Sequence, residues 1–143
     1  MSMSALKTSV TDQDDQQSSR RVLVVDDMAD LANLLRQMIK LLGYDCVAVS
    51  TVKEALSAFN AAISNSKPFD MVITDLVMPG EDSGTQLMQK LRGIDPLVKV
   101  IASSGYRAST SDTTDPENGF CGRLNKPFTI GELQAELHRH LTV

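Results

Sequence analysis

The sequence predicts an α/β protein in which a parallel sheet of five strands is covered by helices on both faces. Short, continuous apolar runs rich in β-branched residues recur along the chain, which is typical of strands buried on both faces. Between them lie longer segments whose apolar residues recur every three or four positions, as in amphipathic helices. Strands that alternate with helices indicate crossover units, which build a doubly wound parallel sheet.

The predicted strands are short apolar runs between turn residues. Four of them are well patterned: Val22–Val25, Cys46–Val49, Met71–Thr74, which ends at Asp75, and Val98–Ala102. A fifth strand, more weakly patterned, is expected within the segment 120–124.

The predicted helices are recognised by apolar spacing and by the residues at their ends. Gly43 is a natural end for the first helix. Ser50 or Thr51 can begin the second, and Thr129 can begin the last. The apolar positions are Leu31, Leu34, Leu35, Met38, Ile39 and Leu42 in the first helix, Val52, Ala55, Leu56, Phe59 and Ile63 in the second, Leu87, Met88 and Leu91 in the third, and Ile130, Leu133, Leu137 and Leu141 in the last.

One further helix is expected to be short or irregular. It would precede the last strand, where the segment 108–119 has no apolar stripe and is poor in helix formers.

Length and composition suit one globular domain behind a polar tail. The chain has 143 residues, of which 42% are hydrophobic and 22% charged. Residues 1–20 are rich in Ser, Asp and Gln, so we expect a disordered tail followed by a domain over 21–143. The net charge of −4 argues against a nucleic-acid surface. No apolar run approaches the ~18 residues that span a bilayer. Together with the lack of an apolar signal core, this predicts a cytoplasmic protein.

Cys46 and Cys121 are not spaced like metal ligands, and we expect two reduced, mostly packed thiols. His138 and His140 are expected to be exposed or to favour the end of the last helix, where cations are stabilised.

Polar residues with a shared chemistry follow the predicted strands. Asp26 and Asp27 come directly after the first strand, and Asp75 ends the third. Ser103, Ser104 and Gly105 follow the fourth strand, and Lys126 stands near the end of the fifth. Because ligand sites of doubly wound sheets lie beyond the carboxyl ends of the strands, we expect these residues to meet at one edge.

These residue types suit phosphoryl transfer assisted by a metal. Three carboxylates at one site repel one another, and a hard divalent cation such as Mg²⁺ relieves the repulsion through oxygen ligands. A carboxylate can be a nucleophile, while a lysine and a serine hydroxyl stabilise phosphoryl oxygens. Each feature alone is also common in turns and helix caps; their conjunction at four strand ends carries the prediction.

With these residues in this order, the chain resembles the receiver domains of response regulators, of both the chemotaxis type and the hybrid-kinase type. The resemblance runs from about Arg21 to the C-terminus and implies the flavodoxin-like strand order 2-1-3-4-5. The matching segments are Val22–Asp27, Val72–Gly80, Val100–Tyr106 and Lys126–Phe128.

The resemblance also implies roles for individual residues. Asp75 would accept the phosphoryl group from a phosphohistidine of a histidine kinase or phosphotransfer protein. Asp27 would bind Mg²⁺ directly, and Asp26 would bind it directly or through water. The remaining protein ligands would be the carbonyl oxygen of Val77 and the carboxylate of Asp75. Ser104 would be the switch hydroxyl, and Lys126 would contact the phosphoryl group from the other side. An unidentified downstream protein would read the switched conformation.

Four departures from the family pattern have consequences. Arg123 stands where an aromatic residue usually couples to the switch hydroxyl, so the usual aromatic switch is in doubt. The segment 108–119 is the second departure, and 80–84 looks one residue longer than the usual loop. Val77 offers no hydrogen bond to orient a hydrolytic water, and Tyr106 would shield the phosphoryl group, so slow self-dephosphorylation is expected.

Three other interpretations of these residues compete with this one. A haloacid-dehalogenase-type phosphohydrolase would use a similar aspartate with Mg²⁺, but that family needs a second acid where this chain has Val77, and there is no room for a cap domain. The chain could also be a receiver excised from a larger regulator, whereas a single-domain phosphorelay shuttle is the favoured expectation. A receiver that binds partners without phosphate is disfavoured by the acidic residues and Lys126. The expectation is that the protein is no enzyme beyond its own phosphorylation and dephosphorylation.

Overall fold

A computed structural model describes residues 20–78, 83–105 and 119–141. Its centre is one parallel sheet of five strands in the order β2-β1-β3-β4-β5. The predicted fold class and strand order are therefore confirmed. The strands are β1 (Arg21–Val25), β2 (Asp45–Val49), β3 (Met71–Asp75), β4 (Lys99–Ser104) and β5 (Gly122–Asn125).

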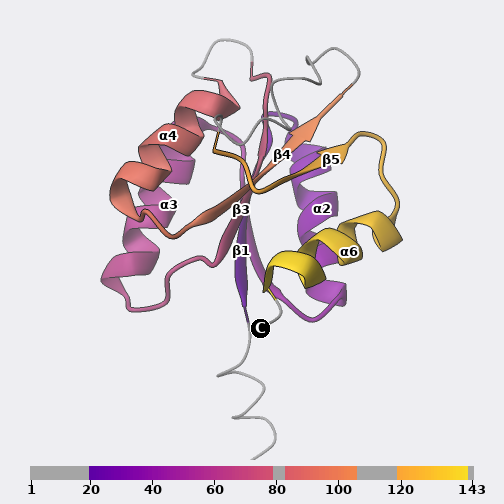
Figure 1. Ribbon diagram of the computed structural model, residues 1–143, viewed down its shortest axis with the longest axis horizontal. Coiled ribbons are helices and arrows are strands. Elements are labelled where there is room, and N and C mark those ends of the chain that lie inside the picture. The colour runs from indigo at the N-terminus through magenta and orange to yellow at the C-terminus, as the bar shows by residue number, and fades with distance from the viewer. Residues whose placement is uncertain (1–19, 79–82, 106–118, 142–143) are drawn as a thin grey trace, which may run out of the picture.

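The helices form one layer on each face of the sheet (Figure 1). Helices α3 (Val52–Ser64) and α4 (Gly84–Ile94) cover one face, and α2 (Ala29–Leu41) and α6 (Ile130–Leu141) cover the other. Two buried apolar clusters fill the spaces between sheet and helices. Successive strand residues belong to alternate clusters, since Val100 and Ala102 pack toward α3 and α4 whereas Ile101 packs toward α2 and α6.

Local sequence signals explain where the helices begin and end. The Thr51 hydroxyl accepts a hydrogen bond from the Glu54 amide at the start of α3. Thr129 does the same for Glu132 at the start of α6, and the Glu132 carboxylate accepts from the Thr129 amide in return. Gly43 follows α2 with a φ of 102°, in the left-handed region that glycine tolerates best.

Two glycines give opposite predictions for the same substitution. Gly43→Ala is expected to lower the free energy of unfolding by about 1 kcal/mol, because an L-residue is strained at this φ. Gly93→Ala is expected to raise it by about 0.5–1 kcal/mol, because alanine is the better helix former and an added Cβ meets open space. Urea unfolding of both variants checks this; a stabilised Gly43→Ala protein would contradict it.

The last two strands differ from the sequence-based expectation. β4 extends through Ser103 and Ser104, so the two serines belong to the strand and do not follow it. The reason is pairing on both sides: Ser103 is in register with Asp75 of β3, and Ser104 with Asn125 of β5. β5 begins two residues later than its expected start, because Phe120 packs into the core cluster beside α3 and α4.

Several predictions concern residues outside the described ranges. These are the disordered tail over most of 1–20, the irregular helix over 108–119, the longer loop at 80–84 and the shielding role of Tyr106. In the part of the chain that is described, no helix has the length and apolar character needed to cross a membrane.

Both cysteines are free, as expected, but they lie in different environments. Cys46 is buried, and burial raises the pKa of its thiol to about 12. Cys121 is exposed, so the expectation of a packed thiol is wrong for this residue. Cys121 precedes β5, whose pairing begins only at Gly122.

Candidate functional site

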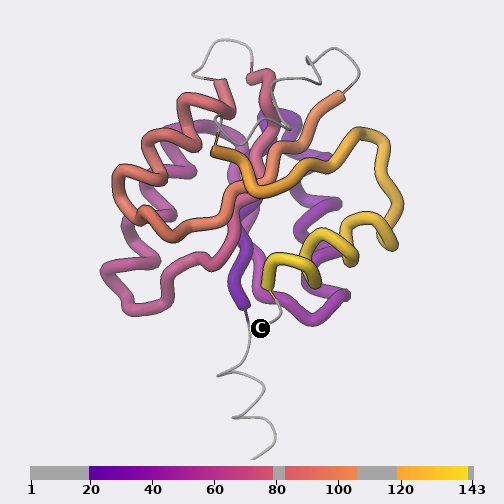
Figure 2. The backbone as a smooth tube through the Cα atoms, viewed as in Figure 1, coloured from indigo at the N-terminus to yellow at the C-terminus, as the bar shows by residue number. Residues whose placement is uncertain are grey.

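Three carboxylates and one ammonium meet at the carboxyl edge of the sheet. Asp26 directly follows β1, Asp75 is the last residue of β3, and Lys126 directly follows β5. Figure 2 shows β3 and β4 running to this same edge. Carboxylate oxygens of Asp26, Asp27 and Asp75 lie within 4.8 Å of one another. The Lys126 Nζ lies 2.8 Å from Asp26 Oδ2 and 3.4 Å from Asp75 Oδ2.

Backbone groups hold the carboxylates in place. The amide of Met28 donates to Asp26 Oδ1 at 3.0 Å, and the amide of Val77 donates to Asp75 Oδ1 at 3.3 Å. Gly84, the first residue of α4, packs directly on the backbone of Asp75, where a Cβ would collide with the carbonyl oxygen of Asp75. The helix start and the end of β3 are thus pressed together, which fixes the position of Asp75.

The electrostatic environment makes the ionised form of Asp75 costly. Burial is the main reason that its pKa is raised, and the negative charge of Asp26 adds to this, while Lys126 counteracts both. Burial opposes the charge of Lys126 too. Its hydrogen bonds and charge interactions with Asp26 and Asp75 outweigh burial, so the pKa of Lys126 is raised and the side chain is an ammonium.

The donor set fits a hard divalent cation. It consists of carboxylate oxygens, and the three carboxylates differ in burial: Asp26 is buried, Asp75 is half-buried and Asp27 is exposed. Mg²⁺ typically keeps several waters and takes few carboxylates, which an edge open to solvent allows. Three negative charges against one ammonium leave an excess that a cation would neutralise. The side chain of Val77 is 52% exposed; the carbonyl of this residue as a further ligand stays a prediction.

Ser103 and Ser104 lie on opposite faces of β4. Both are buried, and neither hydroxyl oxygen has a hydrogen-bond partner among the described residues. Since side chains alternate along a strand, Ser104 continues the face of Ala102 toward α3 and α4, and Ser103 continues the face of Ile101. A switch role for Ser104 would therefore require its hydroxyl to move at the strand end; this role stays a prediction.

Arg123 occupies β5 on the same face of the sheet as Ser104 and Asn125. Its Nε donates to Asn125 Oδ1 at 2.6 Å. Because Asn125 is also in register with Ser104, the hydrogen-bonded pair of Arg123 and Asn125 lies next to Ser104 on the neighbouring strand. Arg123 therefore bonds to Asn125 at the position where the resemblance implies an aromatic ring, and how the switch works here stays a prediction.

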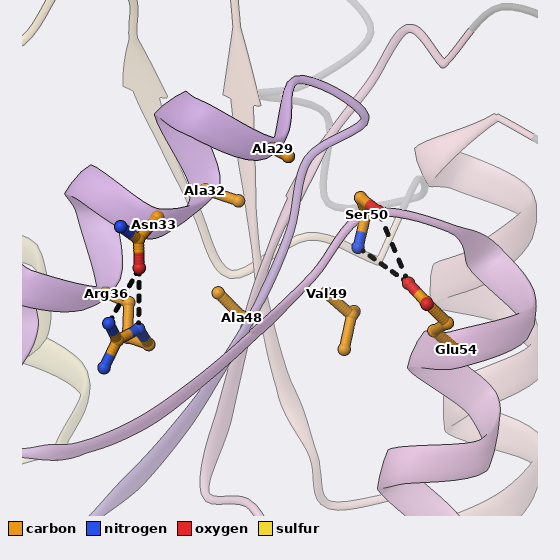
Figure 3. A pocket seen from close by; sticks show the side chains of 8 residues that line it. All are labelled: Ala29, Ala32, Asn33, Arg36, Ala48, Val49, Ser50 and Glu54. Atoms are coloured by element: carbon orange, nitrogen blue, oxygen red, sulfur yellow. Dashed lines mark hydrogen bonds between the residues drawn. The ribbon is translucent and has the colours of Figure 1, made fainter.

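Two hollows lie near this edge of the sheet, and only one adjoins the acidic cluster. The hollow in Figure 3, of about 350 Å³, lies between α2 and β2 and contains none of the predicted site residues. Its polar side chains satisfy one another: Arg36 donates to Asn33, and the Ser50 hydroxyl donates to Glu54. We therefore assign no ligand to it.

The second hollow is an apolar groove of about 470 Å³ that reaches the acidic cluster. Asp26 and Lys126 form its polar end, and its walls come from α2 and the β5–α6 connection. Sequence reasoning missed it, because apolar spacing does not separate exposed leucines from buried ones. Leu31 and Leu34, two of the apolar positions of α2, are 39% and 52% exposed. The apolar wall residues are Leu31, Leu34, Leu35, Met38, Pro127 and Phe128.

The two histidines differ. His138 is exposed, as expected. The His140 side chain is only 14% exposed, and its Nε2 lies 3.3 Å from Oε1 of the buried Glu136. Burial is the main reason that the pKa of His140 is lowered. Both residues lie far along α6 from the acidic edge.

Comparison with known proteins identifies the family. The sequence pattern of the family described as "Response regulator receiver domain" matches residues 22–138. The chain belongs to this family. Receiver domains of response regulators act in two-component signalling, and this chain has that general role. Such domains interact with histidine kinases and downstream effectors.

Individual relatives agree with this assignment. The chain is 33% identical over 120 residues to transcription factor SKN7 of Candida albicans, covering 84% of this chain and 20% of that protein. It is 25% identical over 123 residues to sporulation initiation phosphotransferase F of Bacillus subtilis, covering 86% of this chain and 94% of that protein. The receiver thus spans a small part of one relative and nearly all of another.

A solved structure supports the fold. The signal receiver domain of a putative Luxo repressor protein from Vibrio parahaemolyticus has a TM-score of 0.71 and 29% sequence identity. The match covers 86% of this receiver and 90% of that chain.

Proposed function

We propose that this receiver takes a phosphoryl group from a phosphohistidine onto Asp75 with the help of Mg²⁺, and then signals to a downstream partner by a change of conformation. The observation that carries the proposal is the convergence of three carboxylates and Lys126, with the Lys126 Nζ 3.4 Å from Asp75 Oδ2. A nucleophilic carboxylate next to a metal seat and an ammonium is what in-line transfer of a phosphoryl group needs.

Each residue of the site has a distinct part in this chemistry. Asp75 is the nucleophile, since its Oδ2 lies next to the ammonium that would stabilise an incoming phosphoryl oxygen. Asp26 and Asp27, with Asp75 and the Val77 carbonyl, would hold Mg²⁺, which when bound neutralises charge on the carboxylates and the phosphoryl oxygens. The Ser104 hydroxyl would then donate a hydrogen bond to a phosphoryl oxygen on Asp75, which would bias the receiver toward a second conformation.

The apolar groove between α2 and the β5–α6 connection supports a protein as phosphodonor. A phosphohistidine must approach the acceptor with its own scaffold beside it, and the groove runs from Lys126 along the exposed leucines of α2. Exposed, contiguous apolar surface is typical of protein–protein contact. We therefore propose that the donor protein, a histidine kinase or a histidine phosphotransfer protein, lays an apolar helix face along this groove.

The test of the site is phosphorylation by a small donor. The purified protein is incubated with acetyl phosphate and Mg²⁺, and its intact mass is followed. The expected result is a gain of one phosphoryl group with Mg²⁺ present, and no gain when EDTA is present throughout the incubation. Failure to gain mass under any divalent cation would contradict the proposal, and steady release of phosphate from small esters would favour a phosphohydrolase.

The test of the groove separates docking from chemistry. Leu34→Glu is expected to slow transfer from a phosphorylated histidine protein by roughly tenfold, because it puts a charge into an apolar contact. Phosphorylation by acetyl phosphate should be unchanged, since Leu34 is not one of the residues of the acidic cluster. Leu41→Glu, an exposed leucine of α2 outside the groove, is the matched control. Equal transfer rates in both variants would overturn the docking assignment.

A further inference from the structure

The side chain of Ser103 is buried at the end of β4, and its hydroxyl has no hydrogen-bond partner in the described part of the chain that would explain its presence there. The residue is 3% exposed, and its Oγ has no hydrogen-bond partner among the described residues. A buried hydroxyl without a partner destabilises a protein, so such groups are uncommon outside functional sites. The expected role of the adjacent Ser104 does not account for it, because the two side chains lie on opposite faces of the sheet.

Strand register places Ser103 beside the phosphoryl site. Ser103 is in register with Asp75 on one side and with Leu124 on the other. Ile73 and Leu124 pack in the cluster facing α2 and α6, so Asp75, two residues after Ile73, shares that face. The Ser103 hydroxyl therefore lies on the same face of the sheet as the carboxylate of Asp75.

The path of Lys126 leads over the same position. Lys126 follows β5, whereas its partners Asp26 and Asp75 belong to β1 and β3. β4 lies between β3 and β5 in the sheet, so the lysine side chain crosses the end of β4. On this face, the β4 residue at the crossing is Ser103. An ammonium has three hydrogens to donate, and the two carboxylates account for two of them.

We infer that Ser103 is a positioning residue that accepts a hydrogen bond from the Lys126 ammonium when a divalent cation engages Asp26. The inference rests on the proposed phosphoacceptor function. Asp26 holds Lys126 at 2.8 Å, closer than Asp75 does, and Asp26 is also a proposed metal ligand. When the Asp26 carboxylate binds a cation, it would accept less strongly from Lys126, and the ammonium would need another hydrogen-bond acceptor. The Ser103 hydroxyl supplies it and keeps the ammonium directed at Asp75 and the phosphoryl group that Asp75 receives.

The test compares two side chains of the same shape. Ser103→Thr keeps the hydroxyl and Ser103→Val replaces it with a methyl group, so both place similar bulk in the core. With acetyl phosphate at saturating Mg²⁺, the valine variant is expected to be phosphorylated about tenfold more slowly than the threonine variant, the equivalent of one hydrogen bond to a charged group. The threonine variant should also bind Mg²⁺ more tightly than the valine variant, because the contact between hydroxyl and ammonium forms only in the cation-bound state. Equal phosphorylation rates would overturn the inference.

A second comparison shows whether Ser103 acts through Lys126. In a Lys126→Met background the threonine and valine variants should be phosphorylated at the same rate, because the donor to the hydroxyl is gone. A difference as large as in the Lys126 background would show that the hydroxyl acts in another way and would contradict a positioning role.

A structural measurement keeps this inference separate from the proposed function. In crystals grown with Mg²⁺, the distance from Ser103 Oγ to Lys126 Nζ is expected to be within about 3.2 Å. If the wild-type protein takes up no phosphoryl group, the proposed function fails, and this distance alone then decides the role of Ser103. A separation beyond about 4 Å would rule the contact out.

Discussion

Replacement of Asp75 by asparagine is expected to abolish phosphorylation without unfolding the receiver. The amide lacks the nucleophilic carboxylate, so no acyl phosphate can form. Neither Asp26 nor Asp27 can substitute, because Asp26 is held by Lys126 and by the Met28 amide, and Asp27 does not lie next to the ammonium in the described structure. Intact mass after incubation with acetyl phosphate and Mg²⁺ measures the loss.

The same substitution is expected to preserve or raise stability in the absence of metal. Because the pKa of Asp75 is raised in the folded protein, the native state favours the neutral form, and the ionised form destabilises it at neutral pH. The neutral asparagine removes this cost. The stability gained over wild type should shrink as the pH falls through the pKa of Asp75, where the wild-type carboxyl becomes neutral too. Urea unfolding in EDTA across this pH range measures it.

Asp95→Asn is the matched control for this experiment. Asp95 follows α4 and accepts a hydrogen bond from the Leu97 amide, at the opposite edge of the sheet from the acidic cluster. The Asp95→Asn variant should be phosphorylated at the same rate as the wild type. A phosphorylated Asp75→Asn protein would show that another residue accepts the phosphoryl group and would refute the assignment.

Replacement of Lys126 by methionine is expected to slow phosphorylation by about 100-fold, the typical effect of removing one preorganised electrostatic contact to a transition state. Methionine retains an unbranched apolar chain but brings no charge toward Asp75 Oδ2. The rate with acetyl phosphate at saturating Mg²⁺ measures the effect.

The methionine variant should bind Mg²⁺ more tightly, by roughly tenfold, because an ammonium 2.8 Å from Asp26 Oδ2 repels a cation that uses the same carboxylate. Isothermal titration measures this affinity. Lys53→Met, at an exposed position of α3, is the control for loss of a lysine and should change neither quantity. Weaker Mg²⁺ binding in Lys126→Met would contradict the proposed competition for Asp26.

The fold could be predicted from the sequence because its signals are local. Val22–Val25 and Met71–Thr74 are apolar on both faces of a strand, and the helix ends at Gly43, Thr51 and Thr129 carry their own hydrogen-bonding or backbone preferences. The end of β4 was misjudged, since Ser103 and Ser104 look like turn residues in isolation. Pairing with Asp75 and Asn125 overrides that preference, and pairing between distant strands is invisible in a local pattern.

By itself, the sequence determined which residue types end each strand, and strand-end chemistry was enough to predict that Asp26, Asp27, Asp75 and Lys126 would meet. Only the tertiary structure decided how they meet: Lys126 bonds to Asp26 more closely than to Asp75, Ser103 and Ser104 lie on opposite faces of β4, and an apolar groove opens beside Asp26 and Lys126. The physical reason is that residue type follows from the chain, whereas distance, facing and exposure depend on strand register and on the helices packed against the sheet.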